Sequence, residues 1–168
     1  MSSSPTNPVI LCYDGSPEAA HAIKYAGGLF RDGYALVVTV WQPGQGLGSI
    51  AWSGALDPMD NFVERDRAAA DEAGRRAAEG ARIAQQAGLG AKPLPVEATG
   101  PVWKTLVETA DQHNAAAIVM GSRGYTPLRA VLLGSVSSVV VHHAHQPTLV
   151  IHGHEDGLEV ETDASVAA

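Results

Sequence analysis

Residues 9–17 read VILCYDGSP, an apolar run that stops at an acidic turn and is followed at once by a helix start. Short, strongly apolar runs bounded by turn residues are typical of buried strands. Ser16 followed by Pro17 pairs an N-cap residue with a proline at the first helical position. The stretch therefore predicts a buried strand that passes through a tight turn into a helix.

Four further apolar runs repeat this arrangement, each separated from the next by a longer segment. Together the five runs cover residues 9–13, 35–41, 94–98, 116–120 and 148–151. They are almost continuously apolar instead of alternating with polar residues, which indicates strands covered on both faces, as in a parallel sheet between helix layers. The predicted fold class is α/β.

Two more helix starts are marked by proline, at Asp57–Pro58 and at Gly100–Pro101, the latter opening a helix over about residues 101–114. Small side chains recur at helical spacing within the helix that follows Pro58, at Ala70, Ala73, Ala77, Ala81, Ala84 and Ala87. A packing face made of alanine predicts that this helix lies close to its neighbour. The segment that begins at Gly88 supplies its C-terminal stop.

The charge of the chain is unevenly distributed. The formal net charge is −7, and five of the 18 acidic residues but none of the 11 basic ones lie in residues 155–168. We expect residues 1–7 to be disordered, residues 8–153 to form one domain and residues 154–168 to be a flexible acidic tail. An acidic chain argues against nucleic acid or an anionic membrane surface as a partner.

The N-terminal residues, the length of the apolar runs and the single cysteine together predict a cytoplasmic location. The first residues, MSSSPTN, hold no Lys or Arg, so we expect no secretory signal. No apolar run approaches the roughly 18 residues that a membrane-spanning helix needs. The single cysteine, Cys12, lies within the first strand and is interpreted as a buried structural thiol.

The most informative stretch for function is residues 118–144, IVMGSRGYTPLRAVLLGSVSSVVVHHA, which follows the fourth strand. Glycines let the backbone adopt unusual dihedral angles and let a ligand approach the main-chain amides. The first turn of the helix that starts near Gly134 would offer unpaired N–H groups and the positive end of its dipole to a phosphate. The hydroxyls of Ser135 and Ser137 can add hydrogen bonds. Between Gly121 and Ser137 there are two arginines, Arg123 and Arg129, and no acidic residue, which predicts a local anion site.

The predicted fold places this stretch beside the end of the first strand. If the strand order is 3-2-1-4-5, the order reverses between strands one and four, where open α/β sheets bind ligands. Asp14 ends the first strand, and Met120 and Gly121 end the fourth. Asp14 could accept a hydrogen bond from a base or a ribose hydroxyl, or it could simply brace the turn before Ser16.

Other nucleotide motifs are not supported. The chain contains no G-x-x-x-x-G-K-[ST], so a P-loop is excluded. The GQGLG segment at Gly44–Gly48 follows the second strand but is not followed by a helix start, so a dinucleotide fingerprint is not indicated. Residues 42–56 are interpreted as a long loop, either a lid or interface or a disordered segment.

The glycine spacing Gly121-x2-Gly124-x9-Gly134-Ser135, together with VILCYDGSPEAAHAIKYA at the start and PTLVIHG at the last strand, resembles the ATP-binding branch of the universal stress protein family. The resemblance covers residues 8–153. It implies a single open five-stranded parallel sheet, order 3-2-1-4-5, between about four helices, of the adenine nucleotide alpha-hydrolase-like, Rossmann-like type. It also implies a protein that is usually a homodimer and that binds ATP with Mg²⁺ or Mn²⁺ on its phosphates. The last strand, Thr148–Ile151, is the expected edge of the sheet and so the expected place for the dimer to pair.

The resemblance also implies roles for individual residues. Asp14 matches the acidic residue near the adenine, and Val40 matches the position whose main chain meets the base. Met120 and Gly121 match the ribose side, and weaker assignments fall on Gly15 and Gly100. The phosphate cradle, with its neighbours in the motif, corresponds to Ser122, Arg123, Gly124, Gly134, Ser135, Val136 and Ser137.

Metal binding and catalysis have weaker support in the sequence. The histidines at positions 142, 143 and 145 lack an acidic or cysteine companion nearby, so no protein-held metal site is predicted. No nucleophile with a matching base is evident, so no catalytic residue is assigned. The favoured hypothesis is an adenine-nucleotide-binding regulatory protein of stress responses. The alternatives are a slow ATPase or self-phosphorylating enzyme, and a dimeric scaffold that binds no nucleotide.

Overall fold

A computed structural model describes residues 7–44, 59–98, 100–122 and 134–153 of the 168-residue chain. Its strands are β1 (Val9–Cys12), β2 (Tyr34–Trp41), β3 (Gly90–Glu97), β4 (Ala117–Gly121) and β5 (Thr148–Ile151). Its helices are α1 (Pro17–Leu29), α3 (Met59–Gln86), α4 (Val102–Gln112) and α5 (Ser135–His143). The expected domain limits, the Asp57–Pro58 helix start and most of the 42–56 loop involve residues outside the described ranges.

The five strands form one parallel sheet in the order β3-β2-β1-β4-β5. The central strand β1 pairs with β2 on one side and with β4 on the other, with Val9 opposite Ala35 and Ala117. This confirms the predicted α/β class and the strand order. All carboxyl ends therefore lie at one edge of the sheet.

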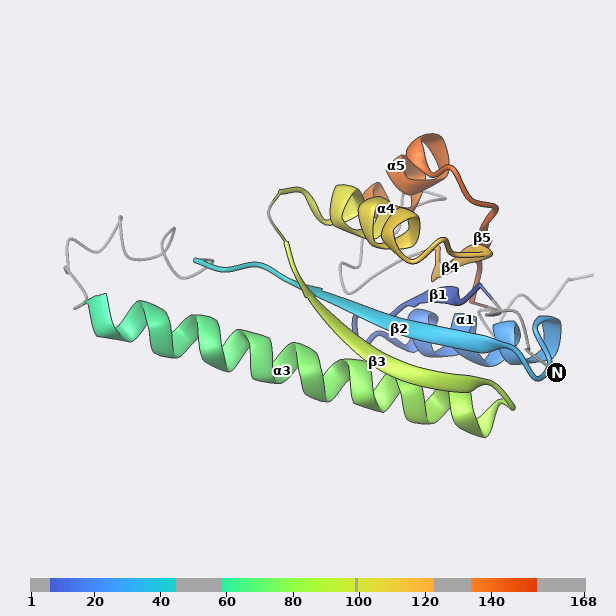
Figure 1. The fold of residues 1–168 in the computed structure, drawn as a ribbon, viewed down its shortest axis with the longest axis horizontal. Helices are drawn as coiled ribbons and strands as arrows, with labels where there is room; N and C mark the ends of the chain where they lie inside the picture. Colours follow the sequence, from blue (N-terminus) through green and yellow to red (C-terminus); the bar gives the residue numbers. More distant parts are fainter. Residues whose placement is uncertain (1–6, 45–58, 99, 123–133, 154–168) are drawn as a thin grey trace, which may run out of the picture.

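Helices cover both faces of the sheet, as Figure 1 shows, with α4 and α5 on one side and α1 and α3 on the other. The core is divided in the same way. One buried cluster joins α1 and α3 to side chains such as Leu11, Val37 and Val119, and the other joins α4 and α5 to Ile10, Val38 and Ile118. Successive residues of a strand point to opposite faces, so the nearly unbroken apolar runs supply both clusters.

The predicted cap of α1 and the predicted stop after α3 are both present in the structure. The Ser16 hydroxyl accepts a hydrogen bond from the Ala19 N–H at 3.2 Å and caps α1. Four of the six predicted alanines of α3 are buried, namely Ala73, Ala77, Ala81 and Ala84. After α3 the chain turns at Gly88, whose φ of +92° favours glycine.

The third strand was predicted too short. It begins at Gly90, four residues before the predicted start, which was missed because Gly90, Lys92 and Pro93 give residues 90–93 little apolar character. Pro93 and Pro95 are tolerated because β3 is an edge strand. The Gly90 and Ala98 N–H groups both donate toward β2, so the residues at odd positions face away from it and lose no sheet hydrogen bond.

Candidate functional site

The carboxyl edge of the sheet contains a point where the connections diverge. From β1 the chain leads to α1 on one face, whereas from β4 it leads to α5 on the other, and β1 and β4 are neighbours. Ligands of open α/β sheets bind at this kind of switch point. The predicted residues that the structure describes lie at the ends of β1, β2 and β4, in the turn after β1 and at the start of α5, except Gly100, which precedes α4.

The turn after β1 is built around Asp14. Its Oδ1 accepts a hydrogen bond from the Ser16 N–H at 2.9 Å, and Gly15 adopts a φ of +89°. One carboxylate oxygen therefore braces the turn, as the structural interpretation of Asp14 predicted. The other oxygen, Oδ2, makes no hydrogen bond with any residue in the described part of the chain. Asp14 is half-buried and retains this acceptor for a ligand.

Cys12, the last residue of β1, is half-buried and not fully buried as expected. Burial raises the pKa of its thiol to about 12, and the nearby Asp14 carboxylate acts in the same direction. The side chain packs against the buried cluster beneath α4 and α5, and a thiol with a raised pKa is a poor nucleophile. The sequence predicted a buried thiol because a cysteine within an apolar run gives no sign of partial exposure.

Val40 follows the point at which β1 stops pairing with β2. The Tyr13 N–H donates to the Val38 carbonyl at 2.9 Å, whereas the Trp41 carbonyl accepts from Ala98 on the β3 side. Because main-chain polar groups alternate sides along a strand, those of Val40 point to the same side as those of Val38, beyond the end of β1. This geometry fits a main chain that meets a ligand.

The end of β4 supplies a buried wall and a junction. The Met120 side chain is buried in the cluster beneath α4 and α5, and Gly121 pairs with Ile151 of β5. The next residue, Ser122, is buried, and its N–H donates to the Ile151 carbonyl at 2.9 Å. Its own carbonyl accepts from the Gly134 N–H at 2.6 Å, so the start of α5 is held against the end of β4.

The first turn of α5 presents its amides at this junction. Gly134 is the N-cap, with extended dihedral angles, and the Ser138 N–H makes the first bond of the helix, to the Gly134 carbonyl at 3.0 Å. The N–H groups of Ser135, Val136 and Ser137 precede that bond and have no acceptor within the helix. Helix N-termini of this kind favour anions.

The other predicted residues are Arg123, Gly124, Arg129 and Gly100. Arg123, Gly124 and Arg129 lie outside the described residues, so their predicted roles remain predictions. Gly100 is half-buried before α4, and a Cβ added there would meet nothing within 4 Å. Close packing against the described residues therefore does not require glycine at that position.

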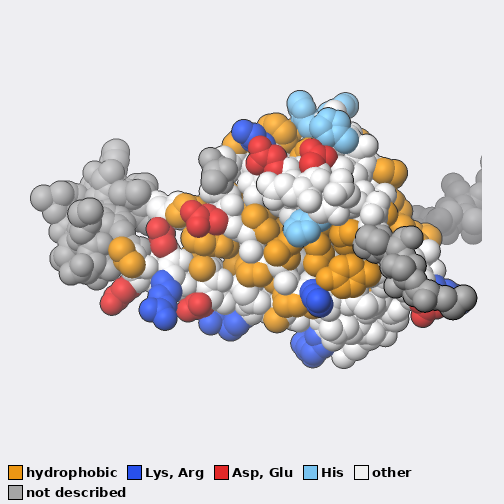
Figure 2. All heavy atoms as spheres, in the orientation of Figure 1, with side chains coloured by type: hydrophobic (Ala, Val, Ile, Leu, Met, Phe, Trp, Pro, Cys, Tyr) orange, Lys and Arg blue, Asp and Glu red, His pale blue; other side chains and the backbone are white. Residues whose placement is uncertain are grey.

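The remaining polar features lie elsewhere. Figure 2 shows histidine side chains gathered over α4 and α5, where His142 and His143 end α5. The Trp103 and His143 rings stack with centroids 4.8 Å apart, and His145 and Gln146 both contact the Asp111 carboxylate. Among the described residues, no three His, Cys, Asp or Glu side chains are grouped to hold a metal ion.

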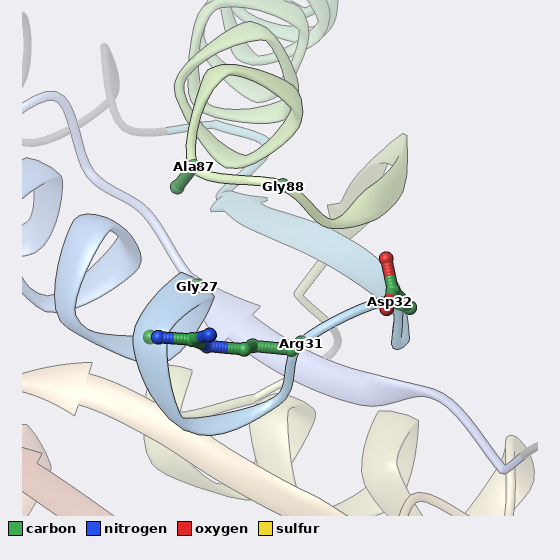
Figure 3. A pocket seen from close by; sticks show the side chains of 6 residues that line it. Gly27, Arg31, Asp32, Ala87 and Gly88 are labelled. Carbon is green, nitrogen blue, oxygen red and sulfur yellow. The ribbon is translucent and has the colours of Figure 1, made fainter.

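A separate hollow of about 470 Å³ lies at the other end of the molecule (Figure 3). It is lined by Gly27, Gly28, Arg31, Asp32, Ala87 and Gly88. These residues belong to the C-terminal ends of α1 and α3, where main-chain carbonyls replace the amides found at the switch point. The hollow does not share the anion-binding character of the α5 start.

No helix within the described ranges is long and apolar enough to cross a membrane.

Comparison with known proteins relates this fold to one family. The sequence model of the Universal stress protein family matches residues 5–152. A universal stress protein of Methanocaldococcus jannaschii, MJ0531, is 32% identical over 148 residues, which cover 85% of this chain and 80% of that protein.

Two solved structures share the fold and contain a nucleotide. A universal stress protein in complex with cAMP has a TM-score of 0.64 and 21% identity, covering 90% of this chain and 100% of that chain. The universal stress protein from Archaeoglobus fulgidus in complex with dAMP has a TM-score of 0.59 and 21% identity, covering 86% and 96%. At this level of identity the likeness establishes the fold alone.

Proposed function

The chain belongs to the universal stress protein family, and from this premise we propose that it is a stress-response regulator that binds an adenine nucleotide at the carboxyl edge of its sheet. The observation that carries the proposal is the junction at the switch point, where the first turn of α5 is held to the end of β4 near the Asp14 turn. Relatives of the same fold with cAMP and dAMP bound support the ligand class.

The parts of the site have distinct roles in this proposal. The free amides at Ser135, Val136 and Ser137 hold phosphate oxygens. The main chain of Val40 and the second carboxylate oxygen of Asp14 meet the base and the ribose. The chain between them, from Met120 through Gly121 and Ser122, forms the wall of the crevice. Arg123 and Gly124 complete the cradle as the family motif implies.

ATP with Mg²⁺ or Mn²⁺ is the proposed physiological form of the ligand. Hard cations of this type bind oxygen and commonly keep several water ligands while they bridge phosphates. The described site offers few anionic protein oxygens besides Asp14, and no group of three acidic or histidine side chains. This donor set fits an ion carried by the nucleotide's phosphates and not one held by a protein cage.

The test is nucleotide binding to the purified protein and to Gly134→Glu. A carboxylate at the N-cap would occupy the space at the first turn of α5 and repel phosphate, so affinity for ATP should fall more than tenfold. Gly74→Glu is the matched control, because a Cβ there meets nothing within 4 Å and the position lies on α3, which packs on the other face. Equal ATP affinity of the wild type and Gly134→Glu would refute the proposal, as would a lack of adenine-nucleotide binding.

Enzymatic activity is the second candidate, favoured by one observation. Ser135 is exposed at the first position of α5, where a hydroxyl would lie beside bound phosphate. Incubation with labelled ATP and Mg²⁺ would reveal either released phosphate or a mass gain of one phosphate. A site without an evident water-positioning residue should turn over slowly at most.

The proposed homodimer uses the β5 edge, Thr148–Ile151. The Ile118 N–H donates to Pro147 and the Ser122 N–H donates to Ile151, so Thr148 and Val150 direct their main-chain groups outward. Three of the large apolar side chains that remain about half exposed, Tyr25, Leu29 and Val141, come from α1 and α5. On the helical wheel of α1, Tyr25 and Leu29 lie away from Gly27, the residue that meets α3, and therefore toward β5.

The opposite edge of the sheet is closed to the same pairing. The outward positions of β3 include Pro93 and Pro95, which have no N–H, and the Ala91 carbonyl already accepts from Gln85 at 3.0 Å. Val150→Pro should therefore convert dimer to monomer in light scattering, whereas Glu97→Pro, the same change at an outward position of β3, should not. A monomeric wild type would refute the dimer and leave nucleotide binding to its own test. The cytoplasmic location remains a prediction.

A further inference from the structure

We infer that Ser137 is a positioning residue: its hydroxyl fixes the start of α5 to the end of β4 and does not itself bind phosphate. The inference rests on the proposed function, since it assigns a role within the phosphate end of that site. It changes the expectation from the sequence, which gave the hydroxyls of Ser135 and Ser137 the same task.

The surroundings of the two hydroxyls differ. Ser137 is 3% exposed, and its Oγ lies 3.0 Å from the Gly134 carbonyl and 3.3 Å from the Ser122 carbonyl. Ser135 is exposed, and its hydroxyl makes no hydrogen bond to the described residues. One hydroxyl is turned into the junction and the other is open to a ligand.

The number of hydrogens that the Ser137 hydroxyl can donate determines whether it can bind phosphate. A serine hydroxyl has one hydrogen to donate, and both of its neighbours here are carbonyl oxygens, which only accept. Ionised phosphate oxygens also only accept. A hydroxyl that gives its hydrogen to these carbonyls has none left for phosphate, although the Ser137 main-chain N–H remains available.

The junction explains why this contact matters for ligand binding. The Ser122 carbonyl accepts from the Gly134 N–H, and the Ser137 hydroxyl shares its one hydrogen between this carbonyl at 3.3 Å and the Gly134 carbonyl at 3.0 Å. The Ser122 N–H donates to Ile151. The hydroxyl therefore adds a second link between β4 and α5, three residues along the helix from the first. These two links fix both the position and the direction of the first turn of α5. They therefore orient the free amides of that turn toward the ligand.

The experiment compares ADP with adenosine, which lacks phosphate, for the wild type, Ser137→Ala and Ser138→Ala. Loss of one buried hydrogen bond should weaken ADP binding by Ser137→Ala roughly five- to tenfold, with adenosine affinity unchanged within about twofold. Ser138→Ala is the matched control, since the Ser138 hydroxyl makes no hydrogen bond to the described residues, and it should leave both affinities unchanged.

Amide hydrogen exchange without ligand separates positioning from direct contact. In free Ser137→Ala the Gly134 and Ser138 amides, which bond to the Ser122 and Gly134 carbonyls, should exchange faster than in the wild type. Weaker ADP binding without faster exchange would make Ser137 a direct ligand and overturn the inference, and so would unchanged ADP binding.

The experiment also distinguishes a Ser137→Ala variant that does not fold from a wild type that binds no nucleotide. If Ser137→Ala does not fold, Ser137→Cys retains the volume and a weak donor and should give an intermediate loss of ADP affinity. An undiminished ADP affinity in that variant would also overturn the inference. If the wild type binds neither ADP nor adenosine, the proposed function fails, which is distinct from equal ADP binding by the wild type and Ser137→Ala.

Discussion

The two faces of the sheet hold their helix pairs together by different means. On one face, α1 approaches the end of α3 through glycine and alanine, so closely that a Cβ added at Gly27 would clash with the carbonyl oxygen of Ala87, the residue after α3. On the other face, α4 and α5 share a buried apolar cluster, to which the Trp103–His143 stack adds an aromatic contact. The Asp111 carboxylate also contacts His145 and Gln146, which follow α5. The first junction therefore depends on a close approach at glycine, whereas the second adds exposed aromatic and polar contacts to its apolar packing.

The two helix pairs also hold different parts of the molecule in place. The α1–α3 pair braces β1 and β2, whereas α5 brings the amides of the candidate phosphate cradle to the end of β4. Close-packed junctions tolerate little displacement, while exposed polar contacts contribute little and are readily rearranged. We therefore expect the α1–α3 junction to tolerate substitution less well than the exposed contacts between α4 and the end of α5. Substitutions at each junction test this contrast.

The largest effect is expected at Gly27. Gly27→Ala should lower the free energy of unfolding by about 2–3 kcal/mol, because the new methyl group meets the main chain of Ala87, which cannot move aside alone. The adjacent Gly28→Ala, whose Cβ meets nothing within 4 Å, should instead raise it by about 0.5–1 kcal/mol through helix propensity. Urea unfolding at one protein concentration measures both. A similar change in the two variants would contradict close packing of α1 on α3.

A smaller loss is expected where α3 lies on the sheet. A Cβ at Gly80 would lie 2.7 Å from Val37 Cγ1 and 2.8 Å from Tyr13 Cδ1, which are side-chain atoms that can shift. Gly80→Ala should therefore cost about 1 kcal/mol, after a partly compensating gain in helix propensity. Gly74→Ala on the same helix has open space and should stabilise. If Gly80→Ala is as stable as Gly74→Ala, this contact is not tight.

Much of the scaffold was predictable, because burial on both faces produces unbroken apolar runs. The runs of β1, β2, β4 and β5 gave the correct strands within one residue at each end. By contrast, the start of β3 was missed, since its prolines are compatible with a strand only at an edge. The alanine face of α3 could be predicted from its spacing. The contact between Gly27 and Ala87 could not, because the two residues are 60 positions apart.

The candidate site was predictable to the level of its elements and less so to the level of its atoms. Glycine spacing located the end of β4 and the start of α5, which the structure brings together. The hydroxyl of Ser137 and one oxygen of Asp14, however, satisfy main-chain groups of this protein. Side-chain type cannot distinguish a ligand contact from a local hydrogen bond, since serine and aspartate suit both.

On the α4–α5 face, removing an aromatic contact should lower the free energy of unfolding by less than the Gly27→Ala substitution does on the other face. His143→Ala loses the stack on Trp103 and should lower the free energy of unfolding by about 0.5–1 kcal/mol. His142→Ala, in the same turn of α5 and exposed, provides the control with the same loss of helix-end interaction. Equal unfolding curves for the two variants would show that the stack does not hold α5.

The smallest effect is expected at Asp111, and it should depend on pH. Hydrogen bonds from Gln146 and then His145 lower the pKa of this carboxyl below its ordinary value of 3.8. A carboxyl with a lowered pKa stabilises the fold above that ordinary value, and the stabilisation is lost as pH falls through the folded-state pKa, because the unfolded chain takes up the proton first. The melting temperature of Asp111→Ala should therefore lie slightly below that of the wild type at pH 7, and this gap should close toward pH 3.

Asp111 is exposed, so the gap in melting temperature should be small and should shrink in salt. A gap that widens as the pH falls, or one as large as that of Gly27→Ala, would mean that the α4–α5 junction is not the weaker of the two.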